Sequence, residues 1–196
     1  FGYTSFRPAQ EAPIASLLRN EDVIGIMPTG AGKSICFQIP ALCKEGLTIV
    51  FSPLISLMKD QVDGLLVQNI PAALINSTLT QSEFNKTMYE VRSGKIKLLY
   101  IAPERLSSNF FCNVLRPLPI AQVIVDEAHC ISEWGHDFRP SYRLIGEWLN
   151  SLPKRPIVGA FTATATKYVE NDIKNLLGLD KANVYVTGFD RPNLSF

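Results

Sequence analysis

Short apolar runs alternate with amphipathic stretches along this chain, and the alternation predicts its secondary structure. Apolar runs of three to five residues between turn residues predict strands, whereas apolar positions repeated every three or four residues predict helices. The predicted strands are 23–27, 47–51, 72–75, 97–101, 122–125, 157–161 and 184–186. Helices with an apolar face are predicted around 14–18, 35–42, 54–65, 84–91 and 169–177.

Local signals predict where several helices begin or end. Thr80 and Glu83 form a capping box before one helix. Ser52 and Pro53 are expected to cap and open another helix. Pro40 is expected to stop or kink the helix in which it lies.

The order of these elements predicts the fold class. Strands alternate with helices throughout, which favours an α/β fold with a mostly parallel central sheet and helices on both faces. The polar motifs follow strand ends, the edge at which open α/β sheets bind ligands. No linker, repeat or low-complexity segment interrupts the pattern, so we expect residues 1–196 to form one domain.

Composition narrows the function classes only slightly. The 196 residues are 46% hydrophobic and carry a net charge of +1, which gives no electrostatic case for nucleic acid in itself. The four cysteines contain no Cys-x-x-Cys pair, so we expect neither a zinc site nor a disulfide framework. With no leader and no apolar run near the ~20 residues of a membrane span, we expect no membrane partner and an intracellular location, cytoplasmic or nuclear.

A phosphate-binding loop is predicted where the first strand ends, in the sequence Met-Pro-Thr-Gly-Ala-Gly-Lys-Ser at 27–34. Gly30 and Gly32 allow backbone N–H groups to turn inward around a polyphosphate. Lys33 can reach the β- and γ-phosphates, and the Ser34 hydroxyl can ligate Mg²⁺. Methionine stands five residues before Gly32, where the usual spacing has glycine.

An acidic pair follows the predicted strand 122–125. Asp126 is placed to hold Mg²⁺ opposite Ser34. Glu127 is placed to orient and deprotonate a water molecule that attacks the γ-phosphate. Two residues further on, His129 could form a hydrogen bond toward Thr162 or Thr164 at a neighbouring strand end.

Two of these motifs together resemble motifs I and II of superfamily-two helicases: Thr29-Gly-Ala-Gly-Lys-Ser34 and Asp126-Glu-Ala-His129. Four more segments resemble the RecQ family: Phe1-Gly-Tyr-Thr-Ser-Phe-Arg-Pro-Ala-Gln10, Ser52-Pro-Leu-Ile-Ser-Leu-Met-Lys-Asp-Gln61, Tyr100-Ile-Ala-Pro-Glu-Arg-Leu106 and Ala128-His-Cys-Ile-Ser-Glu-Trp-Gly-His-Asp-Phe-Arg-Pro140. The resemblance extends over essentially the whole chain. Ala31 stands where close relatives often have glycine, so that turn position cannot need a conformation reserved for glycine.

The resemblance implies a RecA-like fold and an ATP site. Tyr3 and Arg7 would enclose the adenine, and Gln10 would form hydrogen bonds to its edge. The implied nucleotide-binding residues are Tyr3, Arg7, Gln10, Thr29, Gly30, Ala31, Gly32, Lys33 and Ser34. The implied catalytic residues are Lys33, Asp126, Glu127 and His129, with Mg²⁺ held by Ser34 and Asp126.

The resemblance also implies contacts with DNA. Its implied DNA-binding or coupling residues are Ser52, Lys59, Arg105, Trp134, Phe138, Arg139, Thr162 and Thr164. From the residues alone, the first three would equally suit a helix cap or solvated charges, and the aromatic segment could instead pin a long loop to the core. Because only part of a DNA track would lie in this domain, we expect Trp134 and Phe138, together with Arg139, to act in sensing DNA more than in holding it.

Taken together, the resemblance implies the first RecA-like motor domain of an ATP-dependent DNA helicase that moves 3′ to 5′ in replication, recombination and repair. Its partners would be ATP, DNA as single strands and duplex junctions, and a second RecA-like domain of the same polypeptide. This chain alone is expected to have negligible turnover. The alternatives are an RNA-directed ATPase of superfamily two and a nucleotide- and DNA-binding module without turnover.

Overall fold

The computed structural model describes residues 1–2 and 4–187. The strands are β1 (Val23–Ile26), β2 (Leu47–Phe51), β3 (Ala72–Ile75), β4 (Leu98–Ile101), β5 (Ile120–Val125), β6 (Ile157–Thr162) and β7 (Asn183–Val186). The α-helices are α1 (Pro8–Leu18), α2 (Lys33–Cys43), α3 (Ile55–Val67), α4 (Gln81–Arg92), α5 (Asn109–Leu115), α6 (Arg143–Ser151) and α7 (Lys167–Leu177). Three short 3₁₀ segments are η1 (Pro103–Ser107), η2 (Ala128–Ile131) and η3 (Pro140–Tyr142).

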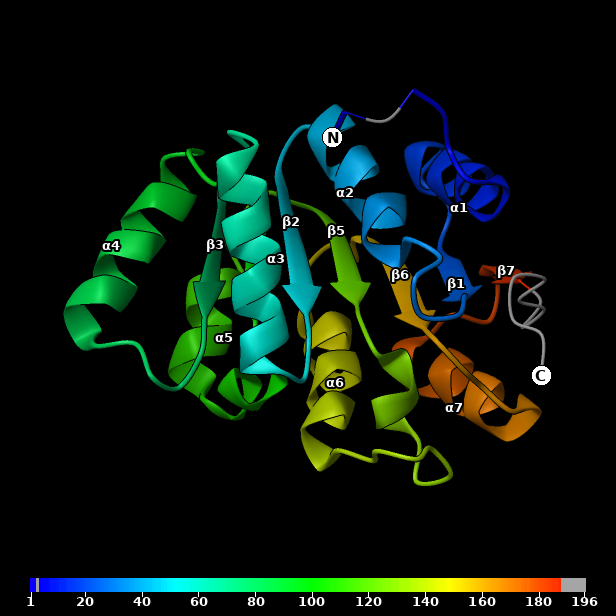
Figure 1. Cartoon of the computed structure of the whole chain (residues 1–196). Helices are drawn as coiled ribbons and strands as arrows, with labels where there is room; N and C mark the ends of the chain where they lie inside the picture. Colours follow the sequence, from blue (N-terminus) through cyan, green and yellow to red (C-terminus); the bar gives the residue numbers. More distant parts are fainter. Residues whose placement is uncertain (3, 188–196) are drawn as a thin grey trace.

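The seven strands form one sheet in the order β3-β4-β2-β5-β6-β1-β7. Every neighbouring pair is parallel. Their carboxyl ends therefore share one edge, and β6 lies between β1 and β5 (Figure 1). The α/β fold with a parallel central sheet that the sequence predicts is confirmed.

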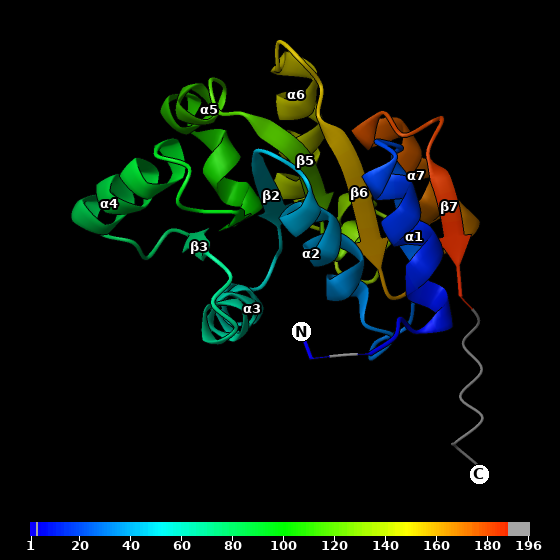
Figure 2. The same cartoon turned by 90° about the horizontal axis from the view of Figure 1, so that it is seen from above.

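Helices cover both faces of the sheet because the strand side chains alternate between two cores. Val50 packs into a core with α1, α2 and α3. Its neighbours Ile49 and Phe51 point to the opposite face and pack with α4, α5, α6 and α7. Figure 2 shows the two helix layers on either side of the strands. None of the helices in the described part of the chain is long and apolar enough to cross a membrane.

One predicted helix start is wrong, and of the two effects expected of Pro40 the stop does not occur. Helix α3 begins at Ile55, not after Ser52, because the backbone N–H of Ser52 still donates to the Ile101 carbonyl at 3.4 Å, beyond the end of β2. Helix α2 does not stop at Pro40 but continues to Cys43, with the proline buried in the core beneath it. The capping box is confirmed, since the Glu83 N–H donates to Thr80 Oγ1 at 3.3 Å and the Glu83 carboxylate accepts from Thr80 N–H at 2.8 Å.

Candidate functional site

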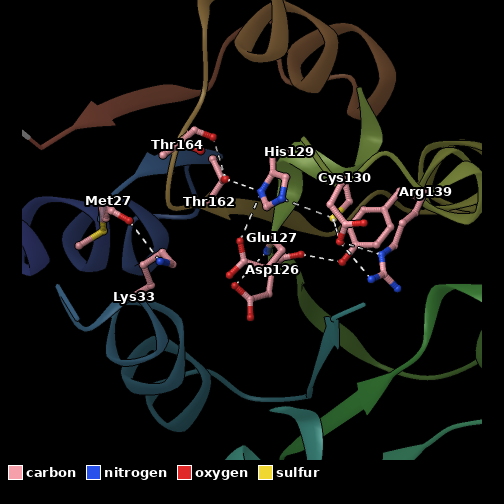
Figure 3. Close-up of polar contacts among 11 residues, drawn as sticks. Met27, Lys33, Asp126, Glu127, His129, Cys130, Arg139, Thr162 and Thr164 are labelled. Atoms are coloured by element: carbon pink, nitrogen blue, oxygen red, sulfur yellow. Dashed lines mark hydrogen bonds and ion pairs between the residues drawn. The ribbon is translucent and has the colours of Figure 1, made fainter. Parts of the chain in front are cut away.

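The predicted polar residues gather at the carboxyl edge of the sheet. The phosphate-binding loop follows β1, the acidic pair follows β5, and Thr162 ends β6 between them. Figure 3 shows Lys33 on one side of Asp126 and Glu127, and His129 on the other. Segments that are about a hundred residues apart in the sequence thus meet because parallel strands end at one edge.

The phosphate-binding loop has the backbone that its sequence predicts. Gly30 and Gly32 have φ angles of 84° and 82°, in the left-handed region that favours glycine. Ala31 does not have a positive φ, which confirms that this position needs no glycine. Lys33 opens α2 and its Nζ donates to the Met27 carbonyl at 3.2 Å, so the lysine lies across the mouth of the loop.

Residues before and within α1 hold this loop from the outside. The Gln10 amide nitrogen donates to the carbonyl oxygens of Ala31 (3.4 Å) and Gly32 (3.2 Å), and its Oε1 accepts from the Arg7 N–H at 2.9 Å. The Arg7 guanidinium donates to the Gly30 carbonyl. Two residues that the sequence assigns to adenine therefore also shape the loop. Tyr3, the third of that group, lies outside the described residues.

A cavity of about 340 Å³ lies beside this loop, between the N-terminal segment and α2. Phe6, Gln10, Ile35 and Ile39 are among the residues that line it. A mostly apolar cavity with one amide suits a flat heterocycle that has hydrogen-bonding edges. A larger cavity of about 900 Å³ opens at the amino edge of the sheet, where Lys44 and Lys154 contribute to its lining, far from the polar motifs.

The acidic pair occupies an unusual electrostatic and backbone position. Burial, followed by the neighbouring charge of Glu127, raises the pKa of Asp126 to about 7, while Lys33 acts in the opposite direction. The Asp126 backbone N–H donates to the Phe51 carbonyl at 2.9 Å, which fixes the turn at the end of β5. Glu127 adopts a φ of 47°, uncommon for a residue with a side chain, and such strained conformations concentrate at functional sites.

His129 connects the acidic pair to the end of β6. Its Nδ1 lies 2.8 Å from Thr162 Oγ1, which donates to the Thr164 carbonyl at 3.0 Å. Because that hydroxyl proton is already used, Nδ1 carries the imidazole proton and Nε2 is the bare nitrogen. The predicted hydrogen bond from His129 toward the Thr162–Thr164 segment is confirmed.

The charge of this histidine follows from its surroundings. The Glu127 carboxylate lies 3.3 Å from Nδ1, a distance compatible with an ion pair. Burial and the stacked ring of His136, whose centroid is 4.0 Å away, nevertheless lower the pKa of His129 to about 4. We conclude that His129 is neutral at physiological pH and that its ring lies beside the Glu127 carboxylate without forming an ion pair with it.

The loop that follows η2 is attached to other strand ends by polar contacts. The Arg139 guanidinium donates to Asp137 Oδ2 at 3.0 and 3.2 Å and to the Pro53 carbonyl, in the connection after β2, at 3.0 Å. The Tyr142 hydroxyl is buried and donates to the Asp126 carbonyl at 2.8 Å. Sequence reasoning missed Asp137, Pro53 and Tyr142, since none of the three carries a signal of its contact partner.

The aromatic residues of this loop have different environments. Trp134 is 76% exposed, so it does not pin the loop to the core. Phe138 is half-buried, with the Arg143 guanidinium 5.2 Å from its ring centroid. The two rings therefore differ in exposure, and Trp134 is the more accessible of the two.

The three other residues that the sequence assigns to DNA have three different environments. Lys59 is exposed on α3. Ser52 is only 1% exposed and its hydroxyl has no partner in the structure. The Arg105 guanidinium lies over the rings of Phe84 and Phe111 at 5.6 and 5.1 Å, with Nε buried and unpaired.

Comparison with known proteins adds a family to this geometry. The family model described as "DEAD/DEAH box helicase" matches residues 7–172. The chain is 51% identical to "ATP-dependent DNA helicase RecQ" of Bacillus subtilis and 48% identical to the protein of that name from Pasteurella multocida. Both matches cover 100% of this chain but only 33% and 31% of the relatives, respectively, so the chain spans about a third of their length. It fits the first RecA-like domain of such proteins.

Solved structures give the same fold at lower sequence identity. A "hypothetical ATP-dependent RNA helicase from Sulfolobus tokodaii" aligns with a TM-score of 0.72 at 21% identity, over 93% of this chain and 53% of that one. The "Pyrococcus furiosus Hef helicase domain" aligns with a TM-score of 0.73 at 18% identity, over 95% of this chain and 39% of that one. At such identities the likeness concerns the RecA-like fold alone.

Proposed function

Because this chain belongs to the DEAD/DEAH box helicase family, we propose that it is the ATP-binding motor domain of a longer RecQ-like DNA helicase. One observation carries the proposal: the phosphate-binding loop and the half-buried acidic pair meet at one sheet edge, where Lys33 acts electrostatically on Asp126. Relatives that match along the whole chain are named ATP-dependent DNA helicases, which supports ATP and DNA as its ligands.

The phosphates of ATP would bind where three sources of positive charge converge. The N–H groups of the Gly30–Gly32 turn, the amino terminus of α2 and the Lys33 ammonium all act on the same small volume. Binding of the phosphates would draw Lys33 away from the Met27 carbonyl, which now accepts from it. The cavity beside Gln10 would receive the adenine, and Arg7 and Tyr3 would complete that contact.

Magnesium fits the donor set of this site. Asp126 is a half-buried carboxylate whose ionised form lacks a full counter-charge, as its raised pKa shows, and the Ser34 hydroxyl lies in the first turn of α2. These two residues would hold the ion. When bound, Mg²⁺ would neutralise charge that develops on the transferred phosphoryl group.

Glu127 would take a proton from the attacking water, and His129 would position it. The neutral imidazole donates its Nδ1–H to Thr162 Oγ1, and the Glu127 carboxylate lies 3.3 Å from the same nitrogen. A neutral ring so close would limit where the carboxylate can move without neutralising it, which would preserve its basicity. His129 thus acts as a positioning residue for Glu127.

The activity of the whole protein rests on parts beyond this chain. We propose that a second RecA-like domain supplies an arginine finger, whose absence costs ~10³–10⁵ in turnover. Movement from 3′ to 5′ and a role in replication, recombination and repair follow from the RecQ resemblance. Lys59, Arg105 and the loop after η2 would contribute to the DNA track, and Thr162 and Thr164 to coupling.

The test is hydrolysis of ATP by the full-length protein. K33A and D126N should each abolish turnover, because they remove the phosphate-binding charge and the metal-binding carboxylate, while circular dichroism and melting temperature stay near wild type. K86A, which changes an exposed lysine on α4 away from the site, is the matched control. Wild-type turnover in well-folded K33A would contradict the assignment, and stimulation by RNA but not DNA would favour the RNA-directed alternative.

A further inference from the structure

An aromatic residue outside every recognised motif lies beside Trp134. Tyr168, the second residue of α7, is 75% exposed, and its ring centroid is 6.5 Å from that of Trp134 at an interplanar angle of 41°. Large aromatic side chains that are so exposed leave apolar surface in water, which is unfavourable, and they do not contribute to the core. Two of them together form a surface that is suited to a flat partner.

Hydrogen bonds join the two segments that carry the rings. Ser132 Oγ donates to Asp172 Oδ2 at 2.6 Å, which attaches the loop after η2 to α7. The Trp134 N–H donates to the same Ser132 oxygen at 3.1 Å. The loop and α7 therefore hold the two rings' points of attachment side by side.

The charges around the rings admit a polyanion. Four carboxylates lie close to them in sequence, and three of these have a cationic partner: Glu133 pairs with Arg143 at 2.7 Å, Asp137 with Arg139 at 3.0 Å, and Glu170 with Lys167 and Lys174 at 2.8 Å. The fourth, Asp172, accepts a hydrogen bond from Ser132 Oγ. The Lys167 side chain, next to Tyr168, remains 85% exposed. Aromatic rings beside accessible cations are the features that bind single-stranded nucleic acid.

We propose that Trp134 and Tyr168 together form a stacking surface for unpaired bases of the DNA strand, with Tyr168 as a contact residue that no motif identifies. The proposal deepens the function given above and rests on it. The sequence alone favours sensing over holding for Trp134. A second exposed ring beside it favours holding, because successive bases of one strand can stack on adjacent rings.

The experiment measures binding of fluorescent oligothymidylate to the full-length protein by anisotropy. Loss of one stacked base costs ~1–3 kcal/mol, so Y168A should weaken binding by about 5-fold to about 150-fold. Y168F, which retains the ring, should bind as wild type. Y89A, which removes a tyrosine that is 68% exposed on α4, should also bind as wild type.

An abasic strand of the same length separates stacking from other effects. Y168A and wild type should bind it equally, because only phosphate contacts remain. Wild-type affinity of Y168A for oligothymidylate, or an equal loss on both strands, would overturn the proposal. If Y168A melts early, Y168L decides, since wild-type affinity without a flat ring would also overturn it. Failure of the proposed function is a separate result, seen as absent ATP hydrolysis in the wild-type protein.

Discussion

The neutral state of His129 leads to a quantitative prediction about stability and pH. Its pKa is about 4 in the folded protein, against an ordinary value of 6.5. The unfolded chain therefore binds more protons than the folded one between these values, and stability rises with pH across that window. At 1.36 kcal/mol per pKa unit, the contribution is about 3 kcal/mol, present in full above pH 6.5 and lost as pH falls through 4.

The perturbation is H129Q, which removes the titrating group and keeps an amide that can donate to Thr162. Urea unfolding of the chain, measured from pH 4 to pH 7, gives the free energy of unfolding of both proteins. Asp126 has a raised pKa and changes stability in the opposite direction over part of this range, so the relevant quantity is the difference between the two proteins. That difference should grow by about 3 kcal/mol in favour of wild type.

Direct titration of the imidazole checks the assumption that the pKa of His129 is lowered in the folded protein. The chain has two histidines, so ¹⁵N-histidine labelling gives two imidazole signals, and H129Q assigns one of them. The His129 signal should remain that of a neutral ring, with Nδ1 protonated, down to about pH 4. A midpoint near 6.5 would refute the reasoning, because burial would then not favour the neutral ring, and a midpoint above 6.5 would mean that Glu127 stabilises the charged ring as an ion pair.

Glycine substitutions supply two further predictions. G32A should destabilise the chain more than G30A in urea unfolding: both replace a left-handed glycine at a cost of ~1–2 kcal/mol, but only a Cβ on Gly32 meets Gln10 Nε2, at 2.3 Å, and displaces its hydrogen bonds. Equal losses would show that Gln10 does not support the loop. G146A should cost ~1–3 kcal/mol because its Cβ would lie 2.0 Å from the Leu176 carbonyl. The control G64A, on an exposed turn of α3 with nothing within 4 Å, should instead stabilise by ~0.4–1 kcal/mol, and a stable G146A would contradict the close packing of α6 on α7.

The strands and the phosphate-binding loop could be predicted because their determinants are local. Continuous apolar runs such as Leu47–Phe51 fit strands buried on both faces, and the pattern of Gly30 and Gly32 fits a turn that only glycine adopts easily. Helix α6 was not among the predicted elements, although Ile145, Trp148 and Leu149 are buried at helical spacing. The first turn of α6 follows η3 without a break. No loop therefore separates this helix from the aromatic segment, and the sequence does not mark where the helix begins.

Contacts between distant segments could not be predicted. The bond from Arg139 to the Pro53 carbonyl joins residues that are 86 positions apart, and neither residue type specifies the other. The sequence suggests a cation for DNA at Arg105, yet the structure places its guanidinium over two phenylalanine rings. In the sequence, nothing distinguishes Tyr168 from the other residues of its helix. Its position beside Trp134 exists only in the folded structure. Such features depend on how the helices pack on the sheet, and the periodicity of apolar residues does not determine that packing.

The polar bonds at the carboxyl edge also bear on how the domain fluctuates. Loops that follow strands usually open on their own, at little cost to the rest of the structure. Here the loop after β5 is fastened to the β2 connection through Arg139, to the end of β6 through His129, and to α7 through Ser132. Opening any one of them requires breaking bonds to the others, so the edge should behave as a single cooperative unit in amide hydrogen exchange. A disturbance that begins at the exposed rings would then reach the acidic pair as one collective displacement and would not fade from residue to residue.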